Sequence, residues 1–335
     1  MAYDANIIQR AAARLEEDRR RRADQLAQRR KAAYAREPRL AELDKQLMRT
    51  MPEVIRLALR RGVSPVEDMQ RLRSDSLALQ EEYGNLLEGI GMARDALENK
   101  PACALCGDSG WRGTEMCSCL KELCAQEQFQ ELSKLLLLGE QSFDSFQMDF
   151  YGQNIWPGQS TSPRANMELV YEVCLNYAEK FGRFPLKNLF LSGPPGLGKT
   201  FLSACIARSV SQQGRSVVYD TAVSVFAQFE NRKFQRDLEG VQSARDDARR
   251  YLSCDLLILD DLGSELTTPF VQSALYELVN SRLSTRRHTV ISSNLTMEAA
   301  AKRYSPAIVS RLEGEYHVLH FFGEDIRLLK KQQMI

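Results

Sequence analysis

A glycine-rich stretch constrains this chain more than any other feature of its sequence. It reads Gly193-Pro194-Pro195-Gly196-Leu197-Gly198-Lys199-Thr200-Phe201. An apolar run precedes it and a segment with helical apolar spacing follows it, so the sequence predicts a strand, a phosphate-binding loop and a helix. In such a loop the backbone N–H groups surround the phosphates, Lys199 reaches the β and γ phosphates, and Thr200 offers a hydroxyl to Mg²⁺. The alternative interpretation is a glycine turn ahead of a structural helix.

The rest of the second half of the chain alternates between strand and helix patterns. Five apolar runs have the length of buried strands: 189–191, 216–219, 256–259, 289–292 and 318–322. Helical patterns separate them, which predicts an α/β fold with a parallel five-stranded sheet covered by helices. The first residues lack the apolar core of a signal peptide and no apolar run is long enough to span a bilayer. We therefore expect a cytoplasmic protein with no membrane partner.

Acidic and amide side chains follow two of these strands. Asp260 and Asp261 end the third apolar run, where a P-loop ATPase needs one carboxylate to hold Mg²⁺ and a second to orient the attacking water. Glu265 is the reserve candidate for the second role. Asn294 ends the fourth strand, where the carboxyl edge of the sheet faces the γ-phosphate, so it is predicted to hold the attacking water. A strand-terminating asparagine is the alternative for Asn294.

The N-terminal part of the chain reads as helical and basic. Residues 6–36 contain no Gly or Pro and predict one long polar helix. We expect a second helix from Leu40 that ends before Pro52, a helical stretch over 54–61, and a further helix from Val66 to the glycines at 89 and 91. Residues 1–61 hold 16 Lys or Arg against 9 Asp or Glu, whereas the remaining residues carry a net charge of −6. Such a basic arm could meet nucleic acid or an acidic protein, or could be a solvated helix face.

Five of the eight cysteines lie between Cys103 and Cys124. Four of them form two close pairs, Cys103 with Cys106 and Cys117 with Cys119, and ten residues separate the pairs. Two such pairs predict a tetrahedral Zn²⁺ site, with glycines turning the chain between them. An iron–sulfur cluster and uncoordinated cysteines remain the alternatives. Cys124 is a spare.

Taken together, several motifs resemble the AAA+ ATPase domain of the DnaC/DnaI-type replicative helicase loaders. They are the phosphate loop, Asp260-Asp261-Leu-Gly, the Ser-Asn strand end, Ser310-Arg311-Leu312 and the closing Phe-Phe-Gly-Glu-Asp-Ile-Arg-Leu-Leu-Lys. The helical N-terminus, the cysteine cluster and the Ser-Phe-Asp-Ser-Phe segment resemble the longer Gram-positive members of this group. The likeness therefore extends over nearly the whole chain.

The resemblance assigns roles to further residues. Arg311 aligns with the arginine finger that reaches the γ-phosphate held by a neighbouring subunit, and Arg327 aligns with the second sensor of its own subunit. Residues 223–250 correspond to a helical insertion that touches single-stranded DNA, with Arg232, Lys233 and Phe234 as contacts. Asp261 replaces the glutamate common in other AAA+ proteins, a feature that the loader group shares.

The resemblance implies a loader of a hexameric, DnaB-type helicase onto single-stranded DNA, with ATP, Mg²⁺ and Zn²⁺ as cofactors. Only 13 residues follow Phe322, too few for a helical lid, so we expect the monomer to hydrolyse ATP slowly and to depend on self-assembly or a partner. A transposition helper of the IstB type and a non-hydrolysing nucleotide-sensing adaptor are the alternatives. The predicted divisions are a helicase-interaction module (1–98), a zinc-binding segment (99–140), a linker (141–164) and the ATPase domain (165–335).

Overall fold

The computed structural model describes residues 3–58, 66–136, 141–234 and 248–333. These residues form two compact units, one of Ala13–Cys117 and one that combines Met1–Ala12 with Ser118–Ile335. The predicted boundaries at 98, 140 and 164 do not coincide with this division. No helix among the described residues is long and apolar enough to cross a membrane.

The smaller unit is mainly helical. It holds most of α1 (Ala5–Arg36), together with α2 (Pro38–Ala58) and α3 (Val66–Gly89), and α2 packs along α3. Among the described residues of this unit, Ala33, Leu40, Leu87 and Leu97 form a buried apolar cluster, and Leu43 on α2 is also buried. The expected helix end before Pro52 is wrong, because α2 continues through this proline to Ala58. A proline removes only one backbone donor from a helix, and packing against a neighbouring helix compensates for that loss.

The larger unit is built on a parallel sheet of five strands, as the sequence predicts. The strands are β3 (Asn188–Ser192), β4 (Val217–Thr221), β5 (Leu256–Leu262), β6 (His288–Ser293) and β7 (His317–His320). Their order is β4-β5-β6-β3-β7, and every neighbouring pair is parallel. The first strand of this sheet in chain order, β3, therefore lies between two other strands. The loop that follows it opens at the carboxyl edge of the sheet, where α/β proteins bind ligands.

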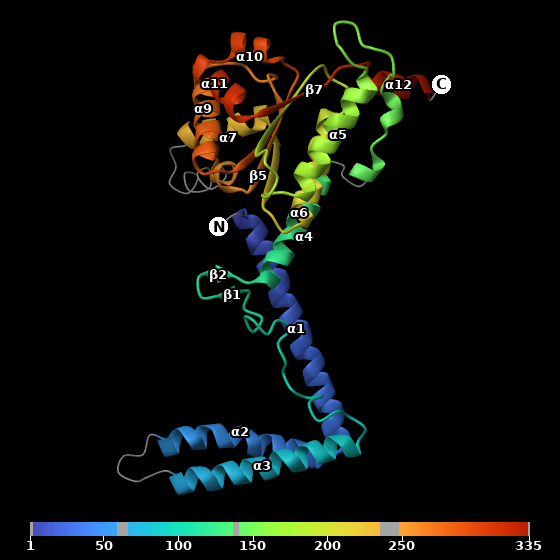
Figure 1. Cartoon of the computed structure of the whole chain (residues 1–335). Helices are drawn as coiled ribbons and strands as arrows, with labels where there is room; N and C mark the ends of the chain where they lie inside the picture. Colours follow the sequence, from blue (N-terminus) through green and yellow to red (C-terminus); the bar gives the residue numbers. More distant parts are fainter. Residues whose placement is uncertain (1–2, 59–65, 137–140, 235–247, 334–335) are drawn as a thin grey trace. The chain divides into compact units, whose positions relative to one another are not determined.

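Helices cover both faces of this sheet (Figure 1). On one face lie α5 (Pro163–Glu179) and α6 (Lys199–Gln212), whose apolar side chains pack with those of β3, β5 and β7. The other face carries α7 (Ala222–Phe234), α9 (Pro269–Ser284), α10 (Met297–Arg303) and α11 (Pro306–Glu315). The helix α4 (Ser118–Leu136) packs against α6, and the short α12 (Ile326–Gln333) follows β7. The three inner strands β3, β5 and β6 are thus buried on both sides, which fits their mainly apolar sequences, whereas the edge strand β7 exposes His317 and His320.

One arginine is fully buried near the amino edge of the sheet. Arg282 on α9 has no exposed surface, and its guanidinium donates to the carbonyl oxygens of Tyr251 (2.7 Å), Cys254 (3.2 Å) and His288 (2.6 Å). Its Nε also donates to the Thr289 hydroxyl at 3.0 Å. The side chain therefore satisfies backbone oxygens of two separate segments, residues 251–254 and the start of β6.

Candidate functional site

The loop between β3 and α6 needs its glycines. Gly196 and Gly198 have φ angles of 81° and 91°, in the left-handed region that other residues avoid. A Cβ atom on Gly196 would lie 2.0 Å from an Asp325 carboxylate oxygen. The start of α12 is also fixed to the loop, because the Ile326 N–H donates to the Gly196 carbonyl oxygen at 3.0 Å. This contact places the C-terminal helix, and Arg327 with it, at the phosphate loop.

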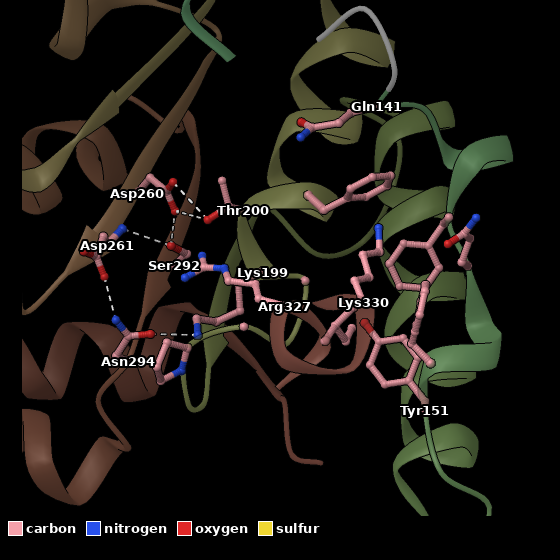
Figure 2. Close-up of a pocket in the computed structure, with 18 of the residues that line it drawn as sticks. Gln141, Tyr151, Lys199, Thr200, Asp260, Asp261, Ser292, Asn294, Arg327 and Lys330 are labelled. Carbon is pink, nitrogen blue, oxygen red and sulfur yellow. Dashed lines mark hydrogen bonds between the residues drawn. The ribbon is translucent and has the colours of Figure 1, made fainter. Parts of the chain in front are cut away.

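A cavity of about 530 Å³ lies beside the loop, a size typical of sites for small molecules. Figure 2 shows the side chains around it. The structure brings together the following predicted residues in its lining: Pro195, Gly196, Gly198, Lys199, Thr200, Phe201, Asp260, Asp261, Asn294 and Arg327. The predicted residues Gly193, Pro194, Leu197 and Arg311 do not line it. The first three belong to the loop itself, and their carbonyl oxygens accept hydrogen bonds from Lys199 or Tyr151.

Lys199 is buried and held by three oxygen atoms. Its Nζ donates to the carbonyl oxygens of Gly193 (2.5 Å) and Pro194 (2.7 Å) and to Asn294 Oδ1 (2.8 Å). Burial lowers the pKa of Lys199 to about 8, although the charges of Asp261 and Asp260 oppose that shift. The ammonium is therefore mostly charged at neutral pH, and phosphate oxygens can take the places of its present partners.

The two predicted magnesium ligands lie side by side. The Thr200 hydroxyl is 3.3 Å from Asp260 Oδ2. Asp260 itself is buried and accepts two further hydroxyl donors, Tyr219 at 2.7 Å and Ser292. Carboxylate and hydroxyl oxygens are the ligands that Mg²⁺ prefers. The pair therefore fits a magnesium ion bound together with nucleotide phosphates.

Asp261 points toward Asn294 because the strand bulges. The ladder between β5 and β6 shifts register between Leu259 and Leu262, and Asp261 has a φ of 58°. Asn294 Nδ2 donates to Asp261 Oδ1 at 2.7 Å, while its Oδ1 accepts from Lys199. Hydrogen bonds thus run without a gap from Lys199 through Asn294, Asp261 and Ser292 to Asp260 (Figure 2).

Glu265 is engaged elsewhere and does not line the cavity. Its carboxylate accepts from the Gly263 N–H (2.7 Å) and from the Tyr304 hydroxyl (2.5 Å), and it is buried. This geometry favours Asp261 over Glu265 as the residue that orients water.

The other side of the cavity is aromatic and comes from a segment that the sequence suggested was only a linker. Two short 3-10 helices, η1 (Phe143–Ser145) and η2 (Met148–Phe150), bring Phe146, Phe150 and Tyr151 to the cavity. The centres of the Phe146 and Phe201 rings lie 5.5 Å apart, and the Tyr151 hydroxyl donates to the Leu197 carbonyl oxygen at 3.0 Å. The aromatic residues of this segment were the sequence signal for its packing, because burial of a large aromatic ring is strongly favourable.

The remaining predicted residues lie outside the cavity. Arg311 is half-buried on α11, and within the described ranges no hydrogen bond or ion pair involves its side chain. Arg232, at the end of α7, pairs with Glu277 at 3.3 Å, and the Lys233 ammonium lies 5.1 Å from the centre of the Phe270 ring. The side chain of Phe234 and residues 235–247, within the predicted DNA-contacting segment, lie outside what the structure describes.

The sequence of the nucleotide site is shared with known proteins. Residues 183–334 match the family model described as IstB-like ATP binding protein. These residues form an IstB/DnaC-like AAA+ ATP-binding domain. The protein y4pL of Sinorhizobium fredii, described as an insertion sequence ATP-binding protein, is 30% identical over 152 residues, which are 42% of this chain and 56% of y4pL. The replicative helicase loader DnaC of Escherichia coli is 24% identical over 136 residues, 41% of this chain and 54% of DnaC.

The matched part is only a portion of each relative, and the chain spans about half the length of the curated relatives that it matches. Among solved structures, a crystal structure of the DnaC helicase loader has 17% identity and a TM-score of 0.43, covering 56% of this chain and 99% of that one. AMPPCP-bound DnaA from Aquifex aeolicus has 22% identity and a TM-score of 0.42, covering 58% and 55% of the two chains.

Outside the IstB/DnaC-like domain, the four predicted cysteines come together. The sulfur atoms of Cys103, Cys106, Cys117 and Cys119 all lie within 4.8 Å of one another. The Cys103 and Cys117 sulfurs are 3.7 Å apart, close to the edge of about 3.8 Å expected for a tetrahedron with Zn–S bonds of about 2.3 Å. A hairpin of two short strands, β1 (Trp111–Arg112) and β2 (Glu115–Met116), joins the pairs. The donor set therefore fits a zinc ion.

A buried carboxylate organises the first cysteine pair. Asp108 accepts the N–H groups of Cys103 (2.8 Å) and Ala102 (3.1 Å) and an ion pair from Arg22 on α1 (2.7 Å). Burial works against the ionised form, but these donors outweigh it and hold the pKa of Asp108 below its usual range. No sequence motif predicts this role of Asp108, because its charged partner Arg22 lies 86 residues away in the chain.

Proposed function

We propose that this chain is an ATP-dependent loader that places a hexameric, DnaB-type replicative helicase on single-stranded DNA, with ATP hydrolysis as the release switch. One observation carries the proposal: a single chain joins the nucleotide site of an IstB/DnaC-like domain to a helical unit and a four-cysteine cluster. The helical unit, residues 13–117, lies outside the matched residues 183–334, so we assign it the contact with the helicase. A nucleotide site linked to a partner-binding module suits a switch whose product matters less than the release it triggers.

ATP is the substrate in this proposal. The phosphate loop binds it, with Lys199 against the β and γ phosphates. Thr200 and Asp260 would hold Mg²⁺, and the bound ion would supply positive charge beside the transferred phosphoryl group. Asp261 orients the attacking water, and Asn294 fixes the Asp261 carboxylate at 2.7 Å. The aromatic side of the cavity accommodates the base and sugar.

Two arginines complete the proposed site. Arg327 lines the cavity and acts within its own subunit, whereas Arg311 lies outside the cavity and serves a neighbouring subunit. Hydrolysis by the monomer is therefore slow. Mixing two inactive full-length variants, Arg311→Ala and Lys199→Met, tests this division. If Arg311 acts in trans, the mixture regains a fraction of wild-type phosphate release, whereas no recovery at any ratio would contradict it.

The helicase partner is tested by size-exclusion chromatography with light scattering. The full chain is mixed with the replicative helicase of its host in the presence of ATP, ADP or no nucleotide. The proposal predicts a complex larger than the helicase hexamer, and failure to form one under all three conditions would overturn the loader function. Arg232 and Lys233 remain the proposed contacts to single-stranded DNA, and substitution of both is expected to weaken binding and its salt dependence.

A second candidate is an IstB-like transposition helper. The 30% identity with y4pL and the IstB-like family match specifically favour it. The four-cysteine cluster and the basic helical unit weigh against it, because such helpers usually have a shorter N-terminus without zinc. ATP-dependent assembly of the full chain on duplex DNA, seen by electron microscopy in the absence of helicase, would favour the helper over the loader.

The four cysteines are proposed to hold one structural Zn²⁺. When bound, the ion would cross-link the two cysteine pairs and stabilise the hairpin between them. Elemental analysis of protein purified without chelators is expected to give one zinc per chain. A metal-free protein that also recovers no metal on reconstitution would exclude the site.

A further inference from the structure

The Asp260 carboxylate is fixed by hydroxyl groups from three separate elements. Tyr219 on β4 donates to Oδ2 at 2.7 Å, Ser292 on β6 donates to Oδ1, and Thr200 on α6 approaches from the loop. We propose that Tyr219 and Ser292 are positioning residues, Tyr219 for the cation-binding carboxylate of Asp260 and Ser292 for the same carboxylate and for the backbone of Asp261. The inference rests on the proposed ATP and Mg²⁺ site, and neither residue belongs to a motif of the sequence.

Tyr219 reaches Asp260 diagonally across the sheet. In the β4–β5 ladder Thr221 lies opposite Asp260, and Tyr219 lies opposite Ile258, two residues earlier. Diagonal neighbours of parallel or antiparallel strands lie beyond the reach of short side chains but within that of an aromatic one. The ring is buried, and its hydroxyl meets a carboxylate, which accepts hydrogen bonds, so the hydroxyl is the donor of this contact.

Ser292 makes the bulge at Asp261 possible. Between Leu259 and Leu262 strand β5 has one more residue than β6 has between Ile291 and Ser293. The N–H of the extra residue, Asp261, leaves the ladder and donates to the Ser292 hydroxyl at 2.9 Å. The same hydroxyl donates its proton to Asp260. A bulge redirects a side chain next to a site, and here one hydroxyl holds both the Asp260 carboxylate and the Asp261 backbone N–H.

Because of these contacts, loss of either hydroxyl should affect binding of the cation and not binding of the nucleotide alone. Neither Tyr219 nor Ser292 donates to the phosphate loop, whereas both donate to a carboxylate that lines the cavity. Loss of either hydroxyl lets Asp260 rotate away from Thr200. We expect weaker binding of Mg²⁺ in the presence of nucleotide, and unchanged affinity for nucleotide without Mg²⁺.

The test is a titration of the full chain with a fluorescent, non-hydrolysable ATP analogue, with and without Mg²⁺. Tyr219→Phe is expected to raise the Mg²⁺ concentration needed for half-maximal binding about tenfold, as removal of an outer partner of a metal ligand commonly does. Its affinity without Mg²⁺ stays within about twofold of wild type, the scatter expected of a change that touches no ligand. The matched control is Tyr251→Phe, which removes a buried hydroxyl that donates to Asp220 at 2.8 Å, away from the cavity.

Ser292→Ala is tested against Ser293→Ala. Ser293 is also buried, but its hydroxyl donates to the Leu262 carbonyl oxygen and touches neither acidic side chain. Ser292→Ala should shift the Mg²⁺ requirement as Tyr219→Phe does, and Ser293→Ala should not. A wild-type Mg²⁺ requirement in both Tyr219→Phe and Ser292→Ala, or an equal loss of affinity with and without Mg²⁺, would overturn the inference. Because binding alone is measured, the result stands even if the protein hydrolyses no ATP.

Discussion

The nucleotide site and the cysteine centre are built in opposite ways. The lining of the nucleotide cavity comes from residues between Gln141 and Lys330, which meet only because a five-stranded sheet brings them together. The four cysteines lie between Cys103 and Cys119, around a hairpin with two residues in each strand. The first site is therefore supported by a large core before any ligand binds. The second comes from one short stretch of chain, and we expect it to depend on a bound metal.

Metal removal should reveal this difference most strongly. Binding of structural zinc contributes about 10–16 kcal/mol to the folding free energy of small zinc-binding peptides. A hairpin with two residues in each strand supplies far less. Treatment of the full chain with a chelator and a thiol reagent should abolish amide-exchange protection over 103–119, measured by mass spectrometry. Protection of β3 and β5 should stay, and nucleotide binding with it. Unchanged exchange in 103–119 after metal loss would contradict the comparison.

A substitution in the core of the larger unit should instead lower the free energy of unfolding of that unit. Arg282→Met leaves several buried carbonyl oxygens without donors, and we expect it to lower the free energy of unfolding by about 2–4 kcal/mol. Arg287→Met is the control, because Arg287 forms a partly exposed pair with Asp255 that is worth about 1 kcal/mol or less. Denaturant titrations compare the two. Equal losses would show that the buried guanidinium has no special role.

Substitution of Asp108, the carboxylate beside the cysteines, should have a smaller effect. Asp108→Asn keeps the shape of the side chain but removes the charge that Arg22 and two N–H groups satisfy. The affinity for zinc should fall about 10–100-fold in competition with a chromogenic chelator. Asp95→Asn, at an exposed ion pair with Lys100, should leave the affinity unchanged. Wild-type affinity in Asp108→Asn would exclude the proposed support.

The smallest effect concerns pH. Burial, and then the charges of Lys187 and Arg282, lower the pKa of His288 to about 4, although Asp255 opposes them. Between about pH 6.5 and pH 4 the unfolded chain binds a proton here that the folded chain does not, so this residue lowers stability as the pH falls. Melting curves at pH 7 and pH 5 should therefore differ less for His288→Phe than for wild type. His317→Gln, at an exposed histidine, should keep the wild-type difference.

The same contrast explains what could be predicted from the sequence. The cysteine pairs and the phosphate loop are local patterns, and the five strands are continuous apolar runs, so all were found. Tyr219 and Ser292 have no local signature, because sheet register and a bulge bring them to Asp260. The sequence predicts a linker for the aromatic segment before α5, and the place of its rings in the cavity lining depends on the folded sheet. The end assigned to a helix at Pro52 failed because packing outweighed one lost hydrogen bond.

Steady-state release of phosphate from ATP by the full chain tests the proposed switch most directly. It should be measured for the protein alone, with single-stranded DNA, and with helicase and DNA together. The account predicts slow turnover alone and a stimulation of at least about tenfold in the complete mixture, lost in Arg311→Ala. Rapid turnover by the isolated chain would contradict the dependence on assembly. No turnover under any condition would instead identify a nucleotide-sensing adaptor.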